Sequence, residues 1–114
     1  MKYKIELYQE AVYFILSQNI KMQAKIQRTI SLLRMFGYSL PNPHSKKIRG
    51  GRGLYELRVK QGNDICRLFY FYYVADIYIV ISGYVKKRNR IDKNELARAR
   101  KLMTKIIYEK NKNN

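Results

Sequence analysis

Two consecutive segments of the sequence have the pattern of strands that are apolar on both faces. Residues 65–73 are apolar apart from Arg67, and residues 77–85 are rich in β-branched residues. Ala75 and Asp76 provide a tight turn between them. A strand with no polar face belongs in the middle of a sheet that is covered on both sides. The pair therefore predicts an α+β fold, in which an antiparallel sheet is packed by helices.

The N-terminal third predicts one strand and two helices. Residues 3–7 alternate apolar and polar side chains, as a short half-buried strand does. Apolar residues then recur at helical spacing over residues 8–19 and again over residues 22–33. Gly37 is placed to cap the C-terminus of the second helix. We expect these two segments to form a helical hairpin.

The middle of the chain predicts a loop followed by a hairpin. Residues 38–53 contain prolines and glycines, and we expect a loop there with at most one short strand, near residues 46–49. Residues 54–60 form the next predicted strand. The turn at residues 61–64 then leads into the first of the two apolar strands.

A last helix follows the sheet. Asp92 is its predicted N-cap, and Glu95 three residues later completes a capping-box pattern. The predicted order is β-α-α-β-β-β-β-α, in one domain spanning residues 1–110, and residues 111–114 are expected to form a frayed basic tail.

The charge of the chain is far from balanced. Lys and Arg number 24 against 8 Asp and Glu, a formal net charge of +16. Such a surface attracts polyanions, of which nucleic acid is the commonest, although an acidic protein or an anionic membrane surface also fits. The lone Cys66 excludes an internal disulfide and suits a reducing cytoplasm. The longest apolar run, residues 68–75, is too short to cross a membrane, and the N-terminus lacks the pattern of a signal peptide.

The residue combinations of the common types of catalytic site are absent from the sequence. His44 is the only histidine and stands in a proline-flanked loop, where we interpret it as an ordinary loop residue. The carboxylates show no metal-ligand spacing, no glycine-rich loop joins a strand to a helix, and the serines have no evident base. We therefore predict neither a metal nor a cofactor.

Cations inside strands are the most informative chemical feature. Arg58 and Arg67 lie on neighbouring predicted strands, and Arg67 stands in an apolar stretch. A buried cation needs a partner or a functional reason. Arg67 is thus either one half of a structural pair with Glu56 or part of an anion site, and the strand register decides between them.

Further positive charge converges on the same end of the sheet. The run from Tyr84 to Arg90 leaves the last strand directly, and the loop before the sheet carries four more cations. A phosphate-binding surface would explain why so many cations gather at one end of the sheet. The rings of Tyr55 and Tyr84 flank these cations and are placed to stack on an unpaired base. The predicted RNA-binding residues are Lys46, Lys47, Arg49, Arg52, Lys60, Tyr84, Arg88 and Arg90.

These motifs together resemble the phage-derived HigB-like branch of the RelE/ParE toxin superfamily. The resemblance covers nearly the whole chain and is carried by residues 36–40 before a proline, residues 54–58, Arg67 opening an aromatic strand, residues 83–87, and a terminal helix with Glu95 and Ala99. It implies a small twisted antiparallel sheet with a helical hairpin on one side and a terminal helix.

The resemblance also implies an activity. RelE-like members are metal-independent endoribonucleases that cleave mRNA, usually on the ribosome, and carry their active residues on the sheet and at the end of the last strand. The positions that match here are Arg58, Arg67, Lys86 and Lys87, with Arg67 as the main phosphate clamp and Arg58 as its support. The chain departs from better-known members in having no histidine near the last strand, so either Lys86 or Lys87 is the expected base.

A partner and three competing functions complete the expectations. The resemblance implies a cognate acidic antitoxin of helix-turn-helix type, which a +16 surface would attract. The alternatives are a ParE-like inhibitor of DNA gyrase, a nucleic-acid-binding module without catalysis, and a folded but inactive toxin.

Overall fold

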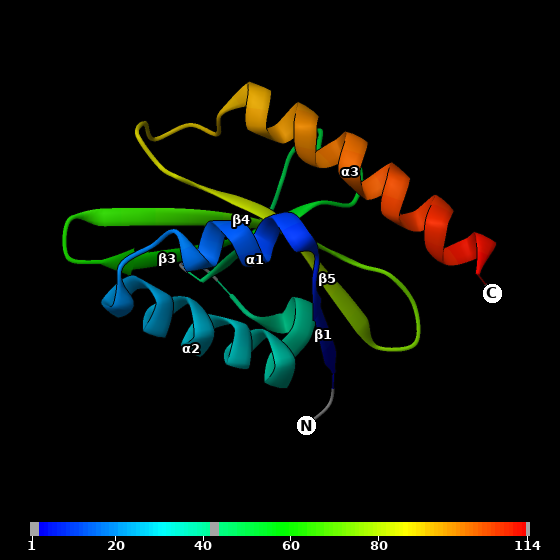
Figure 1. Cartoon of the computed structure of the whole chain (residues 1–114), viewed down its shortest axis with the longest axis horizontal. Coiled ribbons are helices and arrows are strands. Elements are labelled where there is room, and N and C mark those ends of the chain that lie inside the picture. The colour runs from blue at the N-terminus through cyan, green and yellow to red at the C-terminus, as the bar shows by residue number, and fades with distance from the viewer. Residues whose placement is uncertain (1–2, 42–43, 114) are drawn as a thin grey trace.

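In the computed structural model, residues 3–41 and 44–113 are described, and they form five strands and three α-helices (Figure 1). The elements are β1 (Lys4–Leu7), α1 (Gln9–Leu16), α2 (Ile20–Phe36), the 3₁₀ turn η1 (Gly37–Ser39), β2 (Ser45–Lys47), β3 (Tyr55–Gln61), β4 (Asp64–Tyr72), β5 (Ile77–Val85) and α3 (Lys93–Lys112). This confirms the predicted α+β order. Residues 42 and 43 of the predicted loop, and Asn114 of the predicted tail, lie outside the described residues.

The five strands of the described chain form one sheet in the order β1-β5-β4-β3-β2. Neighbours from β2 to β5 pair antiparallel, as predicted. β1 pairs with β5 in parallel, with Ile5 opposite Tyr78, so the sheet is mixed rather than wholly antiparallel. No hairpin turn joins these two strands, and the direction of β1 is therefore set by the long path through α1 and α2 rather than by a local turn.

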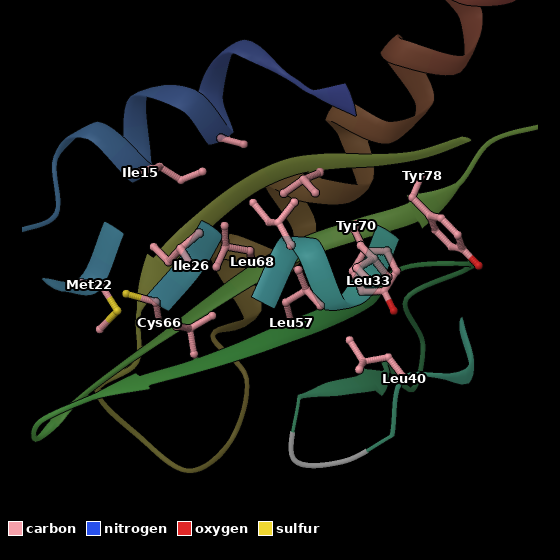
Figure 2. Close-up of a cluster of buried hydrophobic side chains, with 14 residues drawn as sticks. Ile15, Met22, Ile26, Leu33, Leu40, Leu57, Cys66, Leu68, Tyr70 and Tyr78 are labelled. Atoms are coloured by element: carbon pink, nitrogen blue, oxygen red, sulfur yellow. The ribbon is translucent and has the colours of Figure 1, made fainter. Parts of the chain in front are cut away.

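One face of the sheet is covered by α1 and α2. Their buried side chains pack against alternate residues of β3, β4 and β5, with Tyr70 and Tyr78 near one end of the cluster and Met22 and Cys66 near the other (Figure 2). The 3.6-residue spacing of the helices and the two-residue spacing of the strands bring these apolar residues onto one interface.

The opposite face is covered by α3, which runs along the other side of the sheet from α1 and α2 (Figure 1). Leu96, Ala99, Met103 and Ile106 of α3 pack against Phe69, Phe71, Ile79 and Ile81 of the central strands. This confirms that the two central strands are covered on both sides.

Gly83 of β5 allows α1 to approach the sheet closely. A Cβ atom at this position would lie 2.6 Å from Cδ2 of Phe14 and 3.1 Å from the carbonyl oxygen of Arg67. The missing side chain thus makes room for the ring of Phe14 above the strand.

The last helix extends further than the sequence suggests. Residues 111 and 112, expected in a frayed tail, belong to α3. Two contacts hold this end: the Lys110 ammonium lies 2.8 Å from the Glu6 carboxylate, and the Tyr73 hydroxyl donates to Asn111 Oδ1 at 2.8 Å. Sequence periodicity could not reveal these tertiary partners, because they come from β1 and from the residue after β4.

No helix in the described parts of the chain has the length and apolar character required to cross a bilayer.

Candidate active site

A row of side chains crosses the sheet near the ends of β3, β4 and β5. Arg58 of β3 pairs directly with Arg67 of β4, and Arg67 pairs with Tyr84 of β5. Residues directly opposite each other in antiparallel strands project from the same face of a sheet. The two arginines that the sequence placed on neighbouring strands are therefore adjacent, on the face that α3 covers further along.

Arg67 is enclosed by the protein. It is 5% exposed, its Nη2 donates to the backbone oxygen of Asn89 at 2.6 Å, and its Nη1 lies 3.6 Å from Glu56 Oε2. Its Nε is buried and has no hydrogen-bond partner in the described residues. The register thus turns Arg67 towards Glu56, which is the structural pair that the sequence left open.

This geometry connects Arg67 to the segment that follows β5. Its bond to Asn89 holds the segment between β5 and α3, which carries four of the predicted site residues. Because the guanidinium is engaged and nearly covered, it does not offer a free phosphate contact of the kind expected for a main clamp. The exposed Arg58 does offer one.

Lys86 lies at the end of the β4–β5 ladder. Its N–H donates to the carbonyl of Ile65 at 2.7 Å, which continues the ladder one residue beyond β5. Partial burial and the positive charges of Arg58 and Arg67 lower the pKa of the Lys86 ammonium, although Glu56 acts in the opposite direction. The Lys86 ammonium therefore loses its proton more readily than that of an isolated lysine.

Beside this cluster the chain forms a groove between the end of β5 and the start of α3. We call it the β5–α3 groove; its volume is about 830 Å³. Its lining includes Tyr84 and the predicted site residues Lys87, Arg88 and Arg90, together with Asn94 and Glu95 of α3. The predicted basic run thus surrounds a concave surface.

Tyr84 has a structural role in this groove. Its ring stacks on Phe69, with centroids 5.8 Å apart, and its hydroxyl accepts a hydrogen bond from the N–H of Asp92 at 3.1 Å. Asp92 in turn caps α3, since its carboxylate accepts from the N–H groups of Asn94 and Glu95. The N-cap prediction is confirmed, but Tyr84 rather than Glu95 takes the Asp92 N–H that a capping box would use.

The remaining predicted cations fall into two sets. Lys46 pairs with Glu56 and Lys60 with Ile65, which places both on the face of Arg58. Lys47 pairs with Tyr55 and therefore belongs to the opposite face. The exposed Arg49 and Arg52 lie in the loop before β3, and Arg100 of α3 holds that loop through the carbonyl of Gly50 at 2.7 Å.

One expectation about an individual residue needs correction, and one loop residue has a backbone partner that the sequence did not show. Tyr55 does not flank the basic residues: it stacks on Tyr70, with centroids 5.5 Å apart, on the face of α1 and α2. His44, interpreted as an ordinary loop residue, accepts the N–H of Arg58 at its carbonyl, 2.9 Å away, and so sits across from the arginine row. The position of His44 opposite Arg58 follows from the pairing of β2 with β3. In the sequence, the only sign of this pairing was the short strand expected near residues 46–49.

Within the described residues, no group of three or more His, Cys, Asp or Glu side chains comes together as a metal site would require. The chemistry available to this surface is that of cations, one lysine with a lowered pKa, and backbone or side-chain hydrogen bonds.

Comparison with known proteins gives matches for sequence and fold. The family model described as phage derived protein Gp49-like matches residues 13–104. No curated protein sequence matches the chain.

Two solved structures have the same fold. An arginine double mutant of the E. coli toxin RelE in the free state superposes with a TM-score of 0.62 at 16% identity, covering 93% of this chain and 99% of that one. One chain of the archaeal RelE–RelB complex from Pyrococcus horikoshii gives a TM-score of 0.52 at 15% identity, covering 80% of this chain and all of that one.

Proposed function

Because the chain belongs to the Gp49-like family of phage-derived proteins and has the RelE fold, we propose that it is the toxin of a toxin–antitoxin pair and an endoribonuclease that cleaves mRNA on the ribosome. The observation that carries the proposal is the row of Arg58 and Arg67 with Lys86 at its end. A net charge of +16 supports a polyanionic substrate.

The proposed reaction is a transesterification within the RNA. Lys86 Nζ accepts the proton of a 2′-hydroxyl, the 2′-oxygen bonds to the adjacent phosphorus, and the bond from phosphorus to the 5′-oxygen breaks. The products are a 2′,3′-cyclic phosphate and a 5′-hydroxyl that takes its proton from water. The reaction needs an amine that deprotonates readily, and the neighbouring arginines favour that state of Lys86.

The other residues stabilise charge and hold the geometry. Arg58 is exposed beside Lys86 and contacts the phosphate as negative charge develops on its oxygens. Lys87 adds a second phosphate contact from the groove. Arg67 fixes the segment that carries both lysines through the Asn89 carbonyl. The support for this division of roles is the difference in exposure between the two arginines.

The proposed partner that restrains the toxin is an acidic antitoxin of helix-turn-helix type. One structural relative was solved in a RelE–RelB complex. The excess of 24 basic over 8 acidic residues gives this chain a field that would speed association with such a protein.

Cleavage of a defined mRNA tests the proposal directly. The purified chain is incubated with the mRNA in the presence and absence of translating ribosomes, and the ends are mapped and tested for cyclic phosphate. Lys86→Ala is expected to lower the cleavage rate about 10²–10⁴-fold, the usual range for loss of a general base. Arg58→Ala is expected to lower it about 10²–10³-fold, as when one donor to a developing oxyanion is removed.

Matched controls lie on the other side of the sheet. Lys25 and Arg28 are exposed on α2, so Lys25→Ala and Arg28→Ala remove the same charges and should retain cleavage within a few-fold. Loss of activity in His44→Gln with activity kept in Lys86→Ala would transfer the role of base to His44. Intact RNA with the wild-type chain would refute the nuclease; growth arrest with intact mRNA would then favour a gyrase inhibitor, and salt-sensitive binding alone a non-catalytic module.

A further inference from the structure

The β5–α3 groove has a composition that phosphate binding alone does not explain. Cations line one part of it, as a phosphate site requires, and Asp92 lines it as the cap of α3, but the acidic residue Glu95 also lines it. A carboxylate repels the RNA backbone, so its presence in the groove needs another reason.

One ordinary reason for a glutamate in the first turn of a helix is a capping-box contact, and the structure removes that contact. A capping box would direct the Glu95 side chain back to the N–H of Asp92. That N–H already donates to the Tyr84 hydroxyl at 3.1 Å. Glu95 is half-buried, and neither a hydrogen bond nor an ion pair of its side chain with the described residues is observed.

The groove also supplies what a nucleobase needs for stacking. One face of the Tyr84 ring stacks on Phe69, and the residue lines the groove while remaining only partly buried. The volume of about 830 Å³ falls within the range of roughly 300–1,000 Å³ that is usual for small-molecule sites. Unpaired RNA bases are commonly recognised by stacking on an aromatic ring and by hydrogen bonds to their edges.

The groove is held in place next to the proposed catalytic cluster. Tyr84 pairs directly with Arg67, and Arg67 binds the carbonyl of Asn89 within the segment that borders the groove. A base in the groove would therefore belong to a nucleotide adjoining the bond that Lys86 and Arg58 act on.

We propose that the β5–α3 groove binds one unpaired base beside the scissile phosphate, and that Glu95 selects a base with an exocyclic amino group. This rests on the proposed nuclease function for its setting, but base binding can be measured separately. A carboxylate accepts hydrogen bonds and donates none, so it can pair with the amino groups of adenine, cytosine and guanine. Where these bases carry the amino group, uracil carries a carbonyl oxygen, so uracil can offer Glu95 only its single ring N3–H. Asn94, which can donate and accept, supplies a second contact without that restriction.

The test uses short RNAs that bind but are not cleaved. A 2′-O-methyl group at the nucleotide before the scissile phosphate blocks attack, and the base at the variable position is A, C, G or U. Binding to the wild-type chain is measured by fluorescence anisotropy. We expect the amino-bearing bases to bind about tenfold more tightly than uracil, the lower part of the range for a well-placed base contact.

Two variants examine the cause of that preference. Glu95→Gln should bring the four affinities within about threefold, since an amide both donates and accepts. Tyr84→Phe retains the ring but frees the Asp92 N–H, so Glu95 can turn back to cap α3; it should weaken the preference while the carboxylate is still present. Glu109→Gln, which removes an exposed carboxylate at the far end of α3, should leave the preference unchanged.

Each outcome decides the matter. Equal binding of all four bases by the wild-type chain, or a full preference in Glu95→Gln, would overturn the assignment. A preference that Glu95→Gln removes, in a chain that leaves mRNA intact both with and without translating ribosomes, would support the base site and refute the proposed nuclease. Cleavage of the RNA with no difference in affinity among the four bases would support the nuclease and refute the base site.

Discussion

Replacing Arg67 with methionine, which preserves much of its length, should destabilise the fold by about 3–5 kcal/mol, the usual cost of breaking a buried ion pair on one side. Arg67 and Glu56 are 5% and 7% exposed, so the substitution would leave a carboxylate buried without its cation. At 3.6 Å and an effective dielectric constant of about 20, Coulomb attraction of unit charges is roughly 4–5 kcal/mol, which agrees with that range. The carbonyl of Asn89 loses its donor as well.

Urea denaturation and thermal melting measure this effect. For a chain of 114 residues, about 1 kcal/mol corresponds to roughly 4 °C, so the midpoint should fall by about 12–20 °C. The double variant Arg67→Met/Glu56→Leu removes both charges and should recover at least about 2 kcal/mol relative to the sum of the single losses. Arg98→Met, which removes the exposed partner of Glu10, should cost no more than about 1 kcal/mol.

A loss below about 1 kcal/mol for Arg67→Met, or additive losses in the double variant, would refute the view that Arg67 and Glu56 depend on each other. The double variant also has a use in the cleavage assay. If it is folded and stable, any loss of cleavage reports the positioning of the loop rather than unfolding.

Three further perturbations have expected outcomes. Gly83→Ala forces the ring of Phe14 to move and should cost about 1–3 kcal/mol in thermal melts; an unchanged midpoint would show that α1 adapts freely. Arg58→Ala removes a charge that lowers the pKa of Lys86, so the residual cleavage activity should rise through its pH midpoint at a higher pH than in the wild type, and a midpoint shifted to lower pH would contradict Lys86 as the base. Lys60→Ala should reduce the salt slope of RNA binding by about 1, measured by titration at several salt concentrations; an unchanged slope would remove Lys60 from the RNA surface.

Most helices and strands could be predicted from the sequence because the periodicity of apolar residues and the residues at the ends of each element mark them locally. The period of apolar residues changes from two to 3.6 where β1 gives way to α1, and Asp92 marks the start of α3. β1 is an element whose pairing could not be predicted from such local patterns. Its alternation predicts a strand, but its parallel pairing with β5 depends on the path of the intervening chain.

The candidate site was predictable in its charges and less so in the roles of its residues. Arg58 and Arg67 were recognisable as neighbours because a short turn joins their strands. Arg67 is the buried one of the two, and one of its partners is the Asn89 carbonyl, a backbone group that no side-chain pattern identifies. The same holds for His44, whose place across from Arg58 follows from the register of β2.

The parallel pairing of β1 and β5 also determines the order in which the molecule can be assembled during synthesis. α1 and α2 are local structures that can form early, but β1 must wait for β5, which is made only after β2, β3 and β4. Pairing across such a sequence separation is slow compared with helix formation. A product that ends before β5 would carry Arg58 and Arg67 but would lack Lys86, Asn89 and the residues that line the groove. If the chain has the proposed activity, it can acquire that activity only after β5 and the start of α3 have been synthesised, and fragments that end earlier should be inactive.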